Sequence, residues 1–376
     1  TSEDEKRRGA LVLADLYERI GKDSVRAAAT LERTRKAWPL DAEVLAALAG
    51  FMERQGDAGG RRLLVDRVAK DALRSLENRL DAGLFETLVQ AAELSEHPSL
   101  RDSVQAARAT FLGEVTHFSG GQLKALDPDL DDLLAPAGLP LPLRTLLRKT
   151  GAAMDLAFSI DLSALRAQKL TGGPVLERLT QISTALGGQA PEVFVAESLG
   201  SRCLPFTMNP LRFVVGPQLD ELAPDARDYL MLRAFKLQLL GAGALARSRP
   251  EDSWSMLAAL LLLFSPTWRP RGVDARKVAQ SRALVEQGLA RVGYDDDVPV
   301  LALETIGALG EQGENLGNVV RALASRAALL AVGSTAAAVA DTAAGNDKPI
   351  PATGPPRFRW LESTPEANEL LLFLVS

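Results

Sequence analysis

The sequence predicts a mainly α-helical protein with a small β-sheet, an α+β chain in which helices predominate. Alanine and leucine are abundant, whereas aromatic residues make up only 5% of the 376 positions, a composition typical of helix-on-helix packing. Amphipathic helical patterns recur through the first third of the chain, and strand-like segments cluster at residues 192–215. With 47% hydrophobic and 24% charged residues, the chain has the composition of a folded protein of two or three domains.

The first third of the chain contains an internal repeat. Leu-Ala-Asp-Leu-Tyr-Glu-Arg-Ile-Gly at residues 13–21 recurs as Leu-Ala-Gly-Phe-Met-Glu-Arg-Gln-Gly at residues 48–56, an offset of 35. A second amphipathic helix is expected between the copies at 25–37, and it ends at Trp38 and Pro39. Further helices without this spacing are expected at 61–80, 84–95 and 100–112.

This pattern resembles the tetratricopeptide repeat (TPR), a helix–turn–helix unit of 34 residues that stacks into a curved solenoid. The resemblance implies that residues 1–115 form a TPR-like array whose concave groove binds a protein or peptide partner. A set of helical hairpins without the TPR geometry is the alternative.

Glycine, proline and aspartate concentrate at residues 116–142, which are expected to connect the array to a second domain at 143–376. Asp127, Asp129, Asp131 and Asp132 lie in this segment. The glycine and glutamate that an EF-hand calcium loop requires are missing from it. The sequence therefore predicts a solvated acidic turn.

The second domain is expected to place helices around a sheet made of residues 192–197, 202–206 and 211–215. A helix is expected at 174–186 and another at 365–373, after an exposed loop at 344–356. The apolar segments 256–264 and 327–344 are expected to be buried helices. The first is too short to cross a membrane, which takes roughly 20 residues, and the second contains Gly333 and Asp341.

An apolar strand at 213–216 is followed by a turn rich in leucine, proline and acidic residues, and then by a helix. This order resembles the active-site region of the HtpX-like zinc metallopeptidases, whose helix carries His-Glu-x-x-His. The two histidine ligands fall on Arg233 and Leu237, and the glutamate general base falls on Ala234. Arginine stays protonated, leucine has no donor atom and alanine cannot transfer a proton.

The resemblance covers approximately residues 140–376 and includes an edge strand at 193–198. The third-ligand motif of the family, Glu-x-x-Ala-Asp, falls on residues 321–325. Arg321 takes the place of the glutamate ligand and Ser325 that of the aspartate, while the small and apolar neighbours are kept. The resemblance therefore implies a degenerate metallopeptidase domain, a pseudo-enzyme with no metal ligands and no general base.

Residue counts also argue against a metal site or another cofactor. The chain has two histidines, His97 and His117, and one cysteine, Cys203, with none of the spacings that zinc sites use. The histidines are expected in turns or hinges and the cysteine as a buried thiol. A net charge of −5 without a basic block disfavours nucleic-acid binding. A single cysteine and a charged segment at residues 1–8 favour a cytoplasmic protein without a secretory signal.

Two functional hypotheses follow. The first is a non-catalytic interaction or scaffold protein, because the chemical residues are lost while a peptide-binding repeat type is present. The second is a sensor in which Arg233 and Arg321 converge on an anionic ligand or acidic peptide in the former cleft. Neutralisation of these arginines by nearby acids such as Glu304 or Asp228 is the alternative to a bound anion. The sequence shows no carboxylate pair or activated nucleophile for another enzyme mechanism.

A further expectation concerns the former active-site helix. Residues 230, 234, 237 and 241 continue the face of the ligand positions as an apolar stripe. We therefore expect this cleft to be closed, with Leu237 packed against the helix that carries Ala324 and Ala328.

Overall fold

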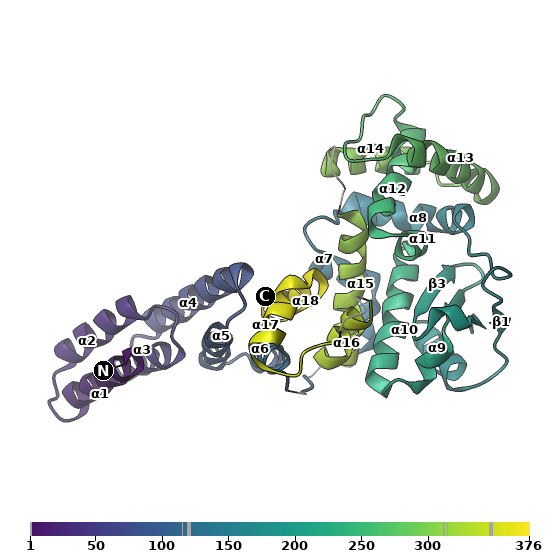
Figure 1. Cartoon of the computed structure of the whole chain (residues 1–376). Helices are drawn as coiled ribbons and strands as arrows, with labels where there is room; N and C mark the ends of the chain where they lie inside the picture. The colour runs from purple at the N-terminus through teal and green to yellow at the C-terminus, as the bar shows by residue number, and fades with distance from the viewer. Residues whose placement is uncertain (1, 115, 119–121, 311–312, 314, 346–348) are drawn as a thin grey trace. The chain divides into compact units, whose positions relative to one another are not determined.

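The computed structural model describes all residues except 1, 115, 119–121, 311–312, 314 and 346–348 (Figure 1). Within the described residues it contains 18 α-helices and one four-stranded sheet, which confirms the predicted mainly α fold. The chain divides by its internal contacts into a first unit, Thr1–Ser119 with Thr342–Ser376, and a second unit, Gly120–Asp341. This division differs from the predicted one, because the C-terminal segment belongs to the first unit and most of the expected connector to the second.

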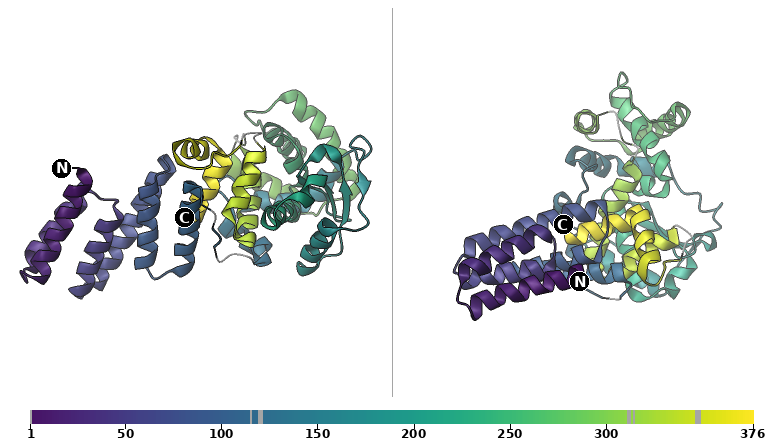
Figure 2. Two further views of the ribbon diagram at one scale, coloured as in Figure 1. Left: turned by 60° about the horizontal axis from the view of Figure 1, so that its bottom comes forward. Right: turned by 60° about the vertical axis from the view of Figure 1, so that its left-hand side comes forward.

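The first unit begins with six helices that run in alternating directions and stack in chain order (Figure 2). They are α1 (Glu3–Arg19), α2 (Ser24–Ala37), α3 (Ala42–Arg54), α4 (Ala58–Asn78), α5 (Ala82–Leu94) and α6 (Pro98–Leu112). The side chains of Asp23, Asp41, Asp57 and Asp81 cap α2 to α5 by accepting hydrogen bonds from first-turn amides. The helices expected at 25–37, 61–80, 84–95 and 100–112 are thus confirmed, with small shifts at their ends.

Alanines and leucines fill the core of this array. Ala27 and Ala49 are fully buried at helix crossings, and Leu31, Leu48 and Val68 pack around them. The small side chains let neighbouring helices approach closely, and the larger ones fill the space between them. No hairpin of this kind buries its apolar face alone, so the stack depends on its neighbours.

A C-terminal hairpin closes the array. It consists of α17 (Gly354–Ser363) and α18 (Pro365–Val375), which pack on α6 and α4. Arg357 donates hydrogen bonds from Nε (2.9 Å) and Nη2 (2.7 Å) to the carbonyl oxygen of Thr110 near the end of α6. Phe358 stacks on Phe111 with ring centroids 4.1 Å apart. The C-terminal segment thereby supplies the end hairpin that a repeat array needs.

The prediction of an exposed loop at 344–356 is wrong at its C-terminal end, because Gly354, Pro355 and Pro356 form the first turn of α17. Proline fits a first helical turn, where its missing N–H has no helical partner to lose. Residues 346–348 of the expected loop lie outside the described residues. The final helix predicted at 365–373 is confirmed as α18.

The helices of the second unit are α7 (Asp131–Leu134), α8 (Leu141–Ala157), α9 (Pro174–Ala185), α10 (Pro224–Leu239), α11 (Gly243–Arg247), α12 (Pro250–Phe264), α13 (Ala275–Val292), α14 (Val298–Leu309), α15 (Leu316–Val332) and α16 (Thr335–Gly345), which crosses the boundary between the units. The sheet of the second unit lies at one side of its helices, next to α9 and α10 (Figure 1). The predicted buried segments correspond to α12 and to the pair α15 and α16, which Gly333 separates with a left-handed φ of 71°. No helix in the described part of the chain is both long and apolar enough to span a membrane.

The sheet has the order β1-β2-β4-β3, with β1 (Gln168–Lys169), β2 (Glu192–Val195), β3 (Cys203–Thr207) and β4 (Arg212–Val215). The three predicted strands are confirmed, whereas the two-residue β1 was not predicted. β2 and β4 pair in parallel with Val193 opposite Phe213, and β4 pairs antiparallel with β3. The Phe213 ring lies 4.7 Å from that of Phe235, which attaches the sheet to α10.

Close approach of backbones fixes the position of α8 against the end of α10. A Cβ atom added at Gly151 would lie 2.5 Å from the Cα atom and 2.8 Å from the carbonyl oxygen of Gly241. We therefore expect Gly151→Ala to lower the free energy of unfolding by about 1–3 kcal/mol, because the two backbones must separate. Urea denaturation checks this value.

Gly307→Ala is the matched control in the same unit. Gly307 lies within α14, and nothing lies within 4 Å of an added Cβ there. This variant is expected to be stabilising by about 0.5–1 kcal/mol, the helix preference of alanine over glycine. Equal effects of the two variants would contradict the close contact at Gly151.

Candidate functional site

The positions at which the sequence resembles the peptidase motif lie on two packed helices of the second unit. Arg233, Ala234 and Leu237 belong to α10, and Arg321 and Ser325 belong to α15, which packs along α10 (Figure 1). Leu237 is 5% exposed, and Ala234 and Ser325 are also buried. On α15, Ala324 and Ala328 are completely buried. The expectation that Leu237 is buried is therefore met.

The two arginines have separate partners. Arg233 forms an ion pair with Asp341 on α16. Arg321 instead donates from Nη2 to the carbonyl oxygens of Ala246 (3.1 Å) and Ser248 (2.7 Å), at the end of α11. Both guanidinium groups are thus bound by protein groups on different elements, and the geometry does not show the convergence on one ligand that the sensor hypothesis requires.

The expectation that Asp228 or Glu304 neutralises these arginines is wrong. Asp228 pairs with Arg178 on α9, whose Nε lies 3.0 Å from a carboxylate oxygen of Asp228. Glu304 lies exposed on α14. The actual partner, Asp341, belongs to the helix that follows the third-ligand motif, a contact that no local spacing reveals.

A buried ion pair anchors α10 one residue before Leu237. The side chain of Lys236 is 1% exposed, pairs with Asp131 on α7 and donates a hydrogen bond of 3.0 Å to the carbonyl oxygen of Leu126. Arg148 on α8 also pairs with Asp131. Burial lowers the pKa of Lys236, while its hydrogen bond to Asp131 opposes that shift.

The solvated acidic turn predicted at residues 127–132 is therefore wrong for Asp131, which is buried. Its negative charge is compensated by the ammonium of Lys236, which lies far away in the sequence. Leu126, Leu134 and Leu139 of the expected connector are also buried, so this segment belongs to the core of the second unit.

A second buried network lies one residue after Leu237. The carboxylate of Asp155 on α8 accepts hydrogen bonds from Gln238 Nε2 (2.8 Å) and Arg247 Nη1 (3.0 Å). Arg247 also donates to three backbone carbonyl oxygens, those of Pro205 (2.8 Å), Phe206 (3.0 Å) and Phe158 (3.0 Å). Burial raises the pKa of Asp155 and lowers that of Arg247, and the attraction between the two charges opposes both shifts.

These two networks fix α10 to α7, α8, α11 and β3. The charged groups of Lys236, Asp155 and Arg247 are each paired with protein atoms, so we attribute structural roles to these residues. Gln238 Oε1 and Arg247 Nε are buried without a hydrogen-bond partner among the described residues. Within the described residues, no three His, Cys, Asp or Glu side chains lie close enough to hold a metal ion. Cys203 is buried in β3, which raises the pKa of its thiol to about 12 and makes it a poor nucleophile at neutral pH.

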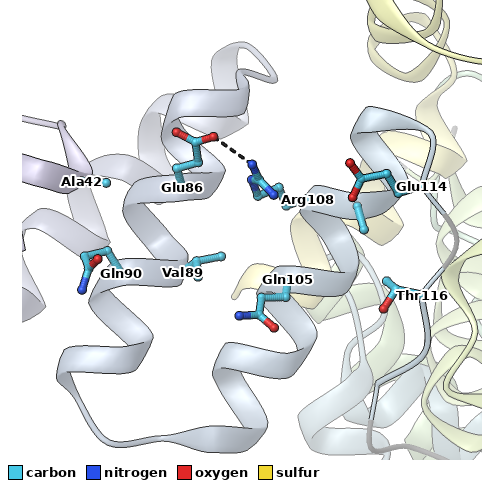
Figure 3. A pocket seen from close by; sticks show the side chains of 9 residues that line it. Ala42, Glu86, Val89, Gln90, Gln105, Arg108, Glu114 and Thr116 are labelled. Carbon is cyan, nitrogen blue, oxygen red and sulfur yellow. Dashed lines mark hydrogen bonds and ion pairs between the residues drawn. The ribbon is translucent and has the colours of Figure 1, made fainter.

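The first unit contains a groove of about 480 Å³ on its helical array (Figure 3). Nine residues line it: Ala42 of α3, Glu86, Val89 and Gln90 of α5, Gln105, Arg108 and Ala109 of α6, and Glu114 and Thr116 after α6. The groove thus crosses successive helices of the stack.

The lining combines an apolar patch with hydrogen-bonding groups. Val89 projects from α5 toward α6, between Gln90 on one side and Gln105 on the other (Figure 3). Glu86 and Arg108 form an ion pair of 2.9 Å at one end, and their side chains are 52% and 34% exposed. Among the described residues, the side chains of Gln90 and Gln105 have no hydrogen-bond partner.

Sequence patterns did not identify this groove. Most of its residues belong to α5 and α6, which lack the repeat spacing, and they come together because these helices stack. The signal that the sequence did contain was the repeat itself, which predicts a surface shared by neighbouring helices.

Comparisons with models of known protein families, with curated proteins and with solved structures found no match to this chain. The likenesses to TPR repeats and to HtpX-like peptidases consequently stay predictions.

Proposed function

We propose that this protein is a non-catalytic interaction protein that binds an extended segment of a partner polypeptide in the groove between α5 and α6. The observation that carries the proposal is the contrast between the two units. In the second unit the motif arginines and the buried charges are bound to protein groups, whereas the groove presents hydrogen-bonding side chains without protein partners.

The chemistry of the lining favours a peptide over a small anion. A carboxamide carries both a donor and an acceptor, so Gln90 and Gln105 can each bond the main chain of an extended peptide. Val89 offers apolar contact between them. Glu86 and Glu114 outnumber Arg108, which favours a segment that carries a lysine or arginine.

The alternative function, an anion sensor in the former peptidase cleft, loses its main support. It required Arg233 and Arg321 to approach each other, but one is bound to a carboxylate and the other to backbone carbonyls. Nothing in the described part of the second unit favours it over the groove.

The proposal predicts that the double variant Gln90→Ala/Gln105→Ala binds peptides about 5-fold to 150-fold more weakly than the wild-type chain. Peptides are first selected from a random library on the wild-type protein, and their dissociation constants are then measured by fluorescence anisotropy. The expected loss reflects hydrogen bonds worth about 0.5–1.5 kcal/mol each. Alanine keeps the helices intact, because it has a high helix propensity.

Gln280→Ala on α13 is the matched control, since Gln280 is an exposed helical glutamine outside the groove. It should leave the affinity unchanged. If the selected peptides bind the double variant as tightly as the wild type, the groove is not the binding surface.

A further inference from the structure

Helix α1 carries an exposed apolar stripe on the face that points away from the core. Val12, Leu13, Leu16 and Ile20 are 58%, 43%, 45% and 76% exposed. Their spacing of one, three and four residues places them on one side of the helix. Gly9 continues the stripe by one turn, and nothing lies within 4 Å of a Cβ added there.

The opposite face of α1 already fills its place in the array. Ala14 is buried in the core of the first unit, and Leu11 and Tyr17 pack against that core. Helix α1 is therefore apolar on two sides. Within the described residues of this unit, the outer stripe has no cover.

The charges beside the stripe are self-complementary. Along one flank, in chain order, lie Glu5, Arg8, Val12, Asp15 and Arg19, with the charge order negative, positive, neutral, negative, positive. Read in the reverse direction, this order becomes positive, negative, neutral, positive, negative. A second α1 in the antiparallel direction thus places Glu5 opposite Arg19 and Arg8 near Asp15. A parallel copy places like charges together.

We propose that Val12, Leu13 and Leu16 of this stripe form an interface with a second copy of this chain, which pairs α1 with α1 in an antiparallel, two-fold arrangement centred near Val12. Ile20 then lies at the edge of the interface, beside the first turn of the other α1. Such a contact is isologous, as in most homodimers. Flanking charges commonly set the direction of helix pairing. The space beside Gly9 of one copy receives Leu16 of the other. One helix pair buries little surface, so the dimer is expected to be weak and concentration-dependent.

Sedimentation velocity over a concentration series of the full chain tests the interface. The wild type is expected to show a monomer–dimer equilibrium, and Leu16→Lys should raise its dissociation constant at least tenfold. Leu63→Lys is the matched control, because Leu63 is a 72% exposed leucine on α4, outside the stripe. A chain that stays monomeric at every concentration, or a dimer that Leu16→Lys leaves unchanged, would overturn the proposal.

Disulfide trapping tests the direction of pairing. Val12→Cys lies near the two-fold axis and should form a crosslinked dimer under mild oxidation, while the native Cys203 is buried. In the antiparallel pair, the two Ile20 positions lie about 24 Å apart along the helices, from a rise of about 1.5 Å per residue. Ile20→Cys should therefore not crosslink. Crosslinking of Ile20→Cys as efficient as that of Val12→Cys would refute the antiparallel arrangement.

Discussion

Replacing Asp155 by alanine is expected to destabilise the second unit by about 3–5 kcal/mol, the usual effect of removing one partner of a buried ion pair. The side chains of Asp155 and Arg247 are 2% and 7% exposed. In the variant, the guanidinium of Arg247 keeps its carbonyl partners but loses the carboxylate that pairs with it, and Gln238 loses its acceptor. An uncompensated buried charge is the physical cause of the loss.

Urea denaturation followed by tryptophan fluorescence measures this effect. The chain has four tryptophans, of which Trp254 and Trp268 lie in the second unit, 5.8 Å apart between ring centroids. Changing Trp38 and Trp360 to phenylalanine in all variants isolates their signal.

Lys149→Ala is the control for this experiment, because Lys149 lies on the same helix and its ion pairs with Asp295 and Asp297 are at the surface. It is expected to change stability far less. A loss below about 1 kcal/mol for Asp155→Ala would show that water reaches Arg247.

Introducing the metallopeptidase motif is not expected to create a zinc site. The quadruple variant Arg233→His, Ala234→Glu, Leu237→His and Arg321→Glu places every ligand and the general base at the motif positions. Leu237 and Ala234 are buried against other residues, so the new side chains meet packed atoms rather than an open cleft.

Losing a buried leucine costs roughly 1.5–3 kcal/mol, and a buried carboxylate without a partner adds to that. The ion pair of Arg233 with Asp341 is lost as well. Zinc content per chain after dialysis and the melting temperature give the readout. Stoichiometric zinc at an unchanged melting temperature would mean that the helices α10 and α15 enclose an open site.

The sequence predicted elements with strong local signals. The helices expected at 25–37, 84–95 and 100–112 have amphipathic patterns long enough to identify them, and they correspond to α2, α5 and α6. The strands at β2, β3 and β4 have enough residues to show a pattern. The two residues of β1 are too few to show one. The prolines at the start of α17 led to the prediction of a loop, because proline is common both in loops and at helix starts.

Contacts between distant residues could not be predicted in the same way. Asp131 seemed solvated because its neighbours are acidic, but Lys236 neutralises it from another helix. The ion pair of Asp341 with Arg233 also joins residues that are far apart in the sequence, and so does the packing of the C-terminal hairpin on α6. The groove residues of α5 and α6 fall in the same class, since only the stacking of the helices brings Val89 and Gln105 together.

The most direct test of the proposed function is to locate a bound peptide. A peptide selected on the wild-type chain is synthesised with a benzophenone side chain and photocrosslinked, and the linked residues are identified by mass spectrometry. We expect links to α5, α6 and the segment at Glu114, with the peptide recovered uncleaved. Links confined to α10 and α15, or hydrolysis of the peptide, would contradict this account.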